Sequence, residues 1–226
     1  TTPEQVCVRD GLVLGPQGSV TIGEVARLWY RRPQDLPPGV DAGGLEVTEG
    51  YKPQRDSGTF GYGVHAALLA LDPETGDVEI LDYVIVEDGG KLVNPMVVDG
   101  QIFGGTAQGI GTALYEEMAF DASGQPLAST FADYLLPGPT EVPEPRLIHM
   151  ETLSPYTEFG VKGIGESGAI PPPAAIGNAI NDALRPLGAQ LHVSPATPRR
   201  ILEAIAQAQA AASAAPRVEA AQEELA

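Results

Sequence analysis

Two apolar stretches in the middle of the chain predict its clearest element, a β-hairpin. Val64–Leu71 is apolar apart from one histidine, and Val78–Val86 alternates at its start and is then continuously apolar. Residues 72–77 between them carry proline and glycine at turn positions. Runs of this length bounded by turn residues are typical of strands, so we expect a pair of buried strands joined by a tight turn.

Shorter apolar patterns predict further strands. Val6–Leu14 has the pattern of a small hairpin that turns near Asp10 and Gly11. Four other segments are each expected to form a single strand: Leu45–Tyr51, Phe131–Leu136, Leu147–Leu153 and Leu191–Val193.

Capping signals and helical spacing predict the helices. Thr21 with Glu24 three residues later is a capping-box signature, and it should open a helix that ends near Tyr30. Ala174–Leu184 has apolar residues at helical spacing, and a last helix is expected over residues 199–212. These elements together predict an α+β fold, in which two or three helices pack on mixed, mostly antiparallel strands.

Composition and charge narrow the class of protein. With 226 residues, 43% of them hydrophobic, the chain can bury a real core. Thirty acidic against 13 basic residues give a formal charge of −17, so nucleic acid and anionic membranes are poor partners. We interpret the acidity as serving solubility. No apolar run approaches the ~20 residues of a bilayer span, and no signal peptide opens the chain.

The ligand-forming residues are few and scattered. Cys7 is the single cysteine, which excludes an internal disulfide and an all-cysteine zinc or iron–sulfur site. A single cysteine also fits a cytoplasmic protein. His65, His149 and His192 each lie in an apolar run, and we interpret them as structural. No metal site made of protein side chains is therefore predicted. The chain begins at Thr1 without a methionine, which suggests a piece of a longer protein.

Glycine is concentrated in two segments. Phe159–Gly168 contains four glycines, Lys162 and Glu166, and three prolines follow it before the next helix. A carboxylate on such a loop can face a ligand, and the alternative is a glycine-rich connector with a solvated glutamate. In residues 100–118, glycines crowd the first half and a helix ending at Glu116-Glu117 is expected in the second. Close approach of a backbone or ligand and tight helix packing both explain that segment.

The loop also contains a literal G-x-G-x-x-G at Gly163, Gly165 and Gly168. A dinucleotide-binding fingerprint must end a strand and open a helix directly. Here Ser154-Pro155 breaks the preceding apolar run and the prolines delay the helix, so a dinucleotide-binding domain is disfavoured.

Three motifs occur in a fixed order: Asp88-Gly89-Gly90 with Asn94-Pro95, the glycine-rich segment from Gly100-Gln101 to Glu116-Glu117, and the loop Gly163-Ile164-Gly165-Glu166. Their order and spacing, with the hairpin before them and the helix after, resemble the C-terminal part of a molybdenum hydroxylase large subunit. This is the family of xanthine dehydrogenase, aldehyde oxidase and aerobic carbon monoxide dehydrogenase. The resemblance covers about residues 6–206.

The resemblance implies the second molybdopterin-binding domain of that family over residues 1–213, followed by an Ala/Glu-rich tail, 214–226, that is expected to be disordered or loosely helical. It implies a molybdenum–pterin cofactor, often the cytosine dinucleotide form in bacterial members, whose dithiolene holds the metal. Glu166 matches the general base of a reaction in which water-derived oxygen attacks an electron-poor carbon. Gln108 matches a glutamine that hydrogen-bonds the cofactor, and the cofactor would also contact Gly104, Gly105, Gly163 and Gly165. We expect Lys162 to help keep Glu166 ionised.

The resemblance also implies partners. Two electrons must leave the molybdenum, and this chain has neither iron–sulfur ligands nor a flavin motif. Iron–sulfur clusters and FAD are therefore expected only on partner subunits or domains, beside the rest of the large subunit. The isolated chain should be inactive, and its small-molecule substrate stays open among aldehydes, N-heterocycles, acyl-CoA thioesters and carbon monoxide. A non-catalytic cofactor-binding or assembly module with the same fold is the alternative function.

Overall fold

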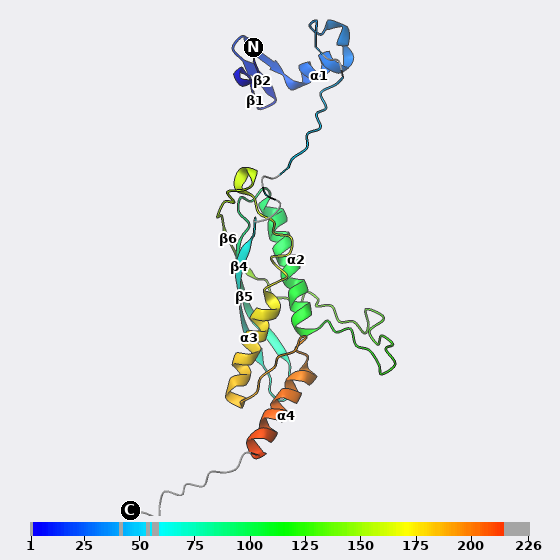
Figure 1. Cartoon of the computed structure of the whole chain (residues 1–226), viewed down its shortest axis with the longest axis vertical. Helices are drawn as coiled ribbons and strands as arrows, with labels where there is room; N and C mark the ends of the chain where they lie inside the picture. The colour runs from blue at the N-terminus through cyan, green and yellow to red at the C-terminus, as the bar shows by residue number, and fades with distance from the viewer. Residues whose placement is uncertain (1, 41–42, 53–54, 56–58, 215–226) are drawn as a thin grey trace, which may run out of the picture. The chain divides into compact units, whose positions relative to one another are not determined.

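The structure is a computed structural model that describes residues 2–40, 43–52, 55 and 59–214 (Figure 1). The chain forms two compact units, Thr1–Lys52 and Pro53–Ala226. Residues 215–226 of the predicted tail lie outside the described residues, and the assignment of 1–213 to one domain stays a prediction. Along the described ranges, no helix combines the length and apolar character that a bilayer crossing requires.

The first unit is a three-stranded antiparallel sheet followed by a helix. The strands are β1 (Cys7–Arg9), β2 (Leu12–Gly15) and β3 (Gly18–Thr21), in that order, and the helix is α1 (Ile22–Arg31). The predicted hairpin is confirmed, whereas β3 was not predicted.

The start of α1 is set by its capping box. Thr21 Oγ1 accepts a hydrogen bond from the Glu24 amide at 3.0 Å, and Glu24 Oε2 accepts one from the Thr21 amide at 3.0 Å. The predicted helix start is therefore confirmed. The strand predicted at Leu45–Tyr51 is wrong, since this segment is irregular and pairs with no strand among the described residues.

The second unit is built on a mixed three-stranded sheet. Strand β4 (Tyr62–Leu71) pairs antiparallel with β5 (Val78–Asp88), and β5 pairs parallel with β6 (Arg146–Met150). The predicted central hairpin is confirmed, and β6 begins one residue before the strand predicted there and ends three residues earlier. Because β5 and β6 are parallel, the chain must cross over between them, and helix α2 (Pro95–Leu114) lies in that crossover.

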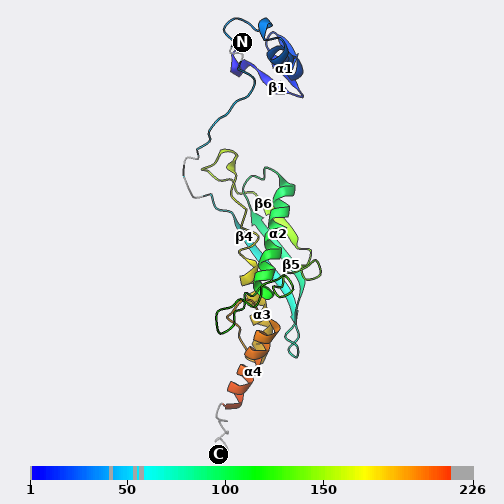
Figure 2. The same cartoon turned by 90° about the vertical axis from the view of Figure 1, so that its right-hand side faces the viewer.

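Helices α2 and α3 (Pro172–Leu184) run alongside this sheet in both views (Figure 1 and Figure 2), and α4 (Pro198–Ala214) follows them. The core between helices and sheet consists of residues that expose no surface: Tyr83, Ile85, Ile102, Ile110, Ile176, Ile180, Leu184 and Ile201. Each fully buried apolar side chain of this size contributes roughly 1.5–3 kcal/mol. The predicted α+β class and the apolar face of α3 are confirmed.

Helix α2 is longer at its start and shorter at its end than the sequence predicts. Asn94 caps it, with Oδ1 accepting from the Val97 amide at 3.3 Å, and Pro95 occupies the first helical position. All glycines of the segment lie inside the helix. It ends at Leu114, so Glu116 and Glu117 lie beyond it.

Two other predicted strands are wrong because local contacts satisfy their backbone groups. In Phe131–Leu136, the Tyr134 amide donates to Thr130 O at 2.8 Å, which makes a turn. In Leu191–Val193, the Leu191 amide and carbonyl both bind the side chain of Asn181, at 2.8 and 2.9 Å. A backbone whose polar groups are already paired gains nothing from a strand partner.

Gly63 leaves room for a buried acid on the neighbouring strand. It pairs in register with Glu87, which is 1% exposed, and a Cβ at Gly63 would lie 2.6 Å from the Glu87 carboxyl carbon. Glu87 Oε1 lies 3.2 Å from Nε2 of the buried His65, whose Nδ1 lies 3.1 Å from the Tyr83 hydroxyl. The carboxylate therefore cannot move away without breaking this chain of contacts.

We expect Gly63→Ala to lower the free energy of unfolding of the chain by about 1–3 kcal/mol, as overpacking usually does. Urea denaturation measures the change. Gly177→Ala is the matched control, because nothing lies within 4 Å of a Cβ at this helical glycine and alanine is favoured there by up to about 1 kcal/mol. Equal stability of the Gly63→Ala chain and the unsubstituted chain would contradict the role given to Gly63.

Candidate functional site

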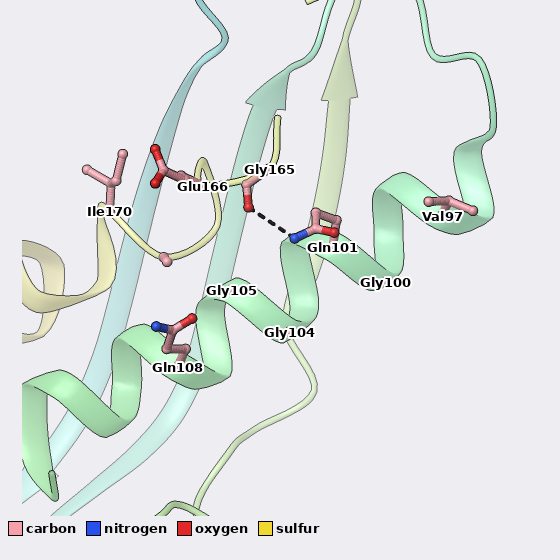
Figure 3. A pocket seen from close by; sticks show the side chains of 10 residues that line it. Val97, Gly100, Gln101, Gly104, Gly105, Gln108, Gly165, Glu166 and Ile170 are labelled. Atoms are coloured by element: carbon pink, nitrogen blue, oxygen red, sulfur yellow. Dashed lines mark hydrogen bonds between the residues drawn. The ribbon is translucent and has the colours of Figure 1, made fainter. Parts of the chain in front are cut away.

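One face of α2 and the loop before α3 enclose a pocket of about 550 Å³ (Figure 3). This volume is in the range of small-molecule sites. The lining residues are Val97, Gly100, Gln101, Gly104, Gly105, Gln108, Gly165, Glu166, Ala169 and Ile170. Of the residues predicted for the site, Gly104, Gly105, Gln108, Gly165 and Glu166 are thus brought together.

Helix α2 presents two glycines and a glutamine to the pocket. We call the two glycines, Gly100 and Gly104, the glycine stripe. Gly100, Gly104 and Gln108 follow one another at intervals of four residues, which places them on one helix face. Nothing lies within 4 Å of a Cβ built on Gly100 or Gly104. These two glycines therefore leave open space on the helix surface where it lines the pocket.

The other glycines of α2 serve packing. A Cβ on Gly105 would lie 2.9 Å from the Ala169 amide nitrogen, and one on Gly109 would lie 2.7 Å from the Pro172 ring. From the opposite side, a Cβ on Gly168 would lie 2.5 Å from Ile102 O. Tight packing therefore explains Gly105 and Gly109, whereas at Gly100 and Gly104 the helix surface is open.

The loop that carries Glu166 is held against the helix. Gln101 Nε2 donates to Gly165 O at 3.0 Å, and Glu166 O accepts from the Ala169 amide at 3.0 Å. Figure 3 shows the Glu166 and Gln108 side chains extending from opposite walls of the pocket, Glu166 from the loop and Gln108 from α2. Glu166 is exposed, and among the described residues no side chain or amide binds its carboxylate. This carboxylate is available to a ligand.

One expectation about this loop is wrong, and the predicted cofactor contact of Gly163 stays a prediction. Lys162 does not pair with Glu166; its Nζ donates to Asp88 Oδ1 at 3.0 Å, in a buried ion pair. Burial alone would raise the pKa of Asp88, but hydrogen bonds from Thr152, Gly90 and Lys162 outweigh it and hold the pKa below its ordinary value. Gly163 does not line the pocket; its backbone forms an isolated bridge with Phe60.

Sequence reasoning did not assign a site role to Gly100, Gln101 and Val97 on the helix or to Ala169 and Ile170 on the loop. Gln101 stands seven residues before Gln108, which is two helical turns. The spacing would therefore have predicted both on one helix face if the helix had been expected to begin at Pro95. Within the described ranges, no group of three His, Cys, Asp or Glu side chains is arranged to hold a metal ion. A metal in this pocket would need its ligands from elsewhere.

The sequence matches the molybdopterin cofactor-binding domain family over residues 1–143. The match contains α2 and ends before the Glu166 loop. The chain is similar to the nicotine 6-hydroxylase large subunit of Paenarthrobacter nicotinovorans, with 41% identity over 207 residues, 90% of this chain and 25% of that protein. It is also similar to the carbon monoxide dehydrogenase large chain of Hydrogenophaga pseudoflava, with 32% identity over 188 residues, 82% of this chain and 22% of that one.

The fold has a counterpart among solved structures. Quinoline 2-oxidoreductase from Pseudomonas putida 86 superposes with a TM-score of 0.81 and 40% sequence identity. The match covers 92% of this chain and 26% of that one. The chain therefore spans about a quarter of the length of the relatives it matches.

Proposed function

This chain belongs to the molybdopterin cofactor-binding domain family found in the large subunits of molybdenum hydroxylases such as xanthine dehydrogenase and carbon monoxide dehydrogenase, and we propose that it supplies part of the active site of such an oxidoreductase. One observation carries the proposal. The open glycine stripe of α2 faces the Glu166 carboxylate, to which no described residue binds, across a pocket of about 550 Å³.

The residues of the pocket fit a molybdenum–pterin cofactor. Gly100, Gly104 and Gly165 have open space where a Cβ would lie, which allows a flat, bulky group to approach the backbone. The side-chain amide of Gln108 can donate to and accept from a pterin or a dithiolene-linked phosphate. The bound cofactor would supply the two-electron redox centre, and we propose the cytosine dinucleotide form. Its dithiolene would hold the molybdenum, so that no ligand cluster from this chain is needed.

Glu166 is the general base in this proposal. The overall reaction converts a C–H bond and water into C–OH, two protons and two electrons. Glu166 accepts a proton from the water-derived oxygen as that oxygen attacks an electron-poor carbon, and a base so placed accelerates a reaction by roughly 10²–10⁴-fold. Gly165 and Gly168 flank the turn that carries Glu166, and neither has a side chain that could crowd this carboxylate.

An N-heterocycle is the substrate class that the comparisons favour. Two of the most similar proteins are named for nicotine and for quinoline, both nitrogen heterocycles. The electrons would leave through iron–sulfur clusters and an FAD on partner subunits or domains. The names of the relatives, a large subunit and a large chain, support an assembly of several subunits. Alone, the 226-residue chain is expected to turn over no substrate with a dye acceptor.

Metal and pterin analysis of the purified native complex tests the proposal. We expect about one molybdenum per copy of this chain, together with a fluorescent pterin oxidation product, because the chain matches the molybdopterin cofactor-binding domain family. A native complex without molybdenum that still binds its partner subunits would contradict catalysis and favour the alternative, an assembly module with the same fold.

A further inference from the structure

Asp88 at the end of β5 connects three separate parts of the second unit. Its side chain is fully buried. Oδ1 accepts from the Gly90 amide at 2.9 Å and from Lys162 Nζ at 3.0 Å, and Oδ2 accepts from the Thr152 amide at 2.7 Å. The donors lie after β5, after β6 and on the glycine loop that leads to Glu166. One carboxylate thus fixes these three segments to one another.

The head group of Lys162 has little freedom. Its side chain is 8% exposed, and the ring centroid of Tyr62 lies 4.9 Å from Nζ. The Tyr62 hydroxyl in turn shares a hydrogen bond of 2.9 Å with Thr152 Oγ1. A buried ammonium group is stable only beside its counter-charge. The lysine is therefore confined between Asp88 and the face of an aromatic ring.

The backbone of the loop is fixed at the same place. The Lys162 amide donates to Gly89 O at 3.1 Å, and the Lys91 amide donates to Gly160 O at 3.2 Å. Gly90 has a φ of +65° and contacts Gly160 O so closely that no Cβ would fit. Side chain and backbone together hold the loop at residue 162, four residues before Glu166.

The far end of the loop is held independently. Gln101 binds Gly165 O, and Gly168 packs directly on the backbone of Ile102. The carboxylate of Glu166 itself has no partner in the described part of the chain. Its position therefore depends on these two attachments, of which only the one at Lys162 is an ion pair.

We propose that the Asp88–Lys162 ion pair is a positioning device that sets where the Glu166 carboxylate lies in the pocket. The inference rests on the proposed function, because it matters for the reaction only if Glu166 is the base. Lys162 does not touch the pocket, and it would act through Glu166 alone.

The first test measures the loop itself, by hydrogen–deuterium exchange of the 226-residue chain. In Lys162→Met, the hydrogen-bonded amides of Ser167, Ala169 and Ile170 should exchange at least about tenfold faster, as expected when a local opening becomes easier, while β4 and β5 stay protected. Lys91→Met is the matched control. It removes an exposed ion pair with Glu151, at 3.3 Å, from the same region and should leave exchange in the loop unchanged. Unchanged exchange in Lys162→Met would overturn the proposal.

The second test is a double-mutant cycle in the assembled enzyme. Lys162→Met should lower kcat/KM by at least about tenfold, and the same change in a Glu166→Gln background should lower it less than about twofold, because residues that act through one another are not additive. Lys162→Arg, which keeps the charge, should recover part of the loss. If Lys162→Met does not fold, Lys162→Arg takes its place in the cycle, and its smaller loss should likewise shrink in the Glu166→Gln background.

The outcomes separate the inference from the function on which it rests. If Glu166→Gln is slow and the loss from the Lys162 variant is fully additive to it, the positioning role is wrong and the proposed function stands. If Glu166→Gln is as active as the unsubstituted enzyme, the proposed function fails, and the positioning role fails with it.

Discussion

Glu166→Gln in the assembled enzyme is expected to lower kcat/KM at least about 100-fold, the lower bound for the loss of a positioned general base. Glutamine keeps the size and hydrogen-bonding capacity of the side chain and removes only its ability to take a proton. The loss should fall on kcat/KM because the proton moves on the way to the transition state. Molybdenum content should not change, since the carboxylate makes no contact that shapes the loop among the described residues.

Two other glutamates provide controls for this prediction. Glu116 accepts a hydrogen bond from the Tyr134 hydroxyl at 2.5 Å, and Glu117 pairs with Arg200. Both therefore stabilise the connection after α2 and its attachment to α4, and neither lines the pocket. Their glutamine variants should keep most activity. A Glu166→Gln enzyme with full molybdenum and near-native kcat/KM would show that the catalytic role assigned to Glu166 is wrong.

The parts of the fold that the sequence predicts are those with strong local signals. The hairpin of β4 and β5 combines two long apolar runs with a six-residue turn, and α3 has four buried residues at helical spacing. Helix propensity does not predict the first half of α2, because the glycines between Gly100 and Gly111 disfavour a helix. Contacts between Gly105, Gly109 and the backbone before α3 stabilise the helix there, and such tertiary contacts cannot be read from local sequence.

Half of the residues that line the candidate pocket were predictable from the sequence, whereas the contacts that hold them in place were not. The order of the motifs identified Gln108, Gly104 and Glu166 together, and the structure places all three around one pocket. Lys162 was misassigned because it is close to Glu166 in sequence. Its partner, Asp88, lies 74 residues away, and only the fold of β5 against the loop brings the two charges together.

Gly104 and Gly105 are expected to respond in opposite ways to the same substitution. At Gly104 the helix surface is open, so Gly104→Leu should leave the free energy of unfolding of the chain unchanged or raise it by up to about 1 kcal/mol, since leucine is a better helix former than glycine. At Gly105 a Cβ would lie 2.9 Å from the Ala169 backbone, so Gly105→Leu should lower that free energy by at least about 1–3 kcal/mol. Urea denaturation of the two variants checks both values.

The substitution at Gly104 should also weaken cofactor binding. The new side chain at Gly104 would occupy the pocket between α2 and Glu166. If the cofactor lies on this stripe, overpacking of 1–3 kcal/mol predicts about a 5- to 150-fold loss of affinity, and the molybdenum content of the assembled enzyme should fall although the chain stays folded. A stable chain without molybdenum is a combination that general destabilisation does not produce. A Gly104→Leu enzyme with full molybdenum content would show that the cofactor binds elsewhere, because a leucine at this position and a ligand on the glycine stripe cannot share the same space.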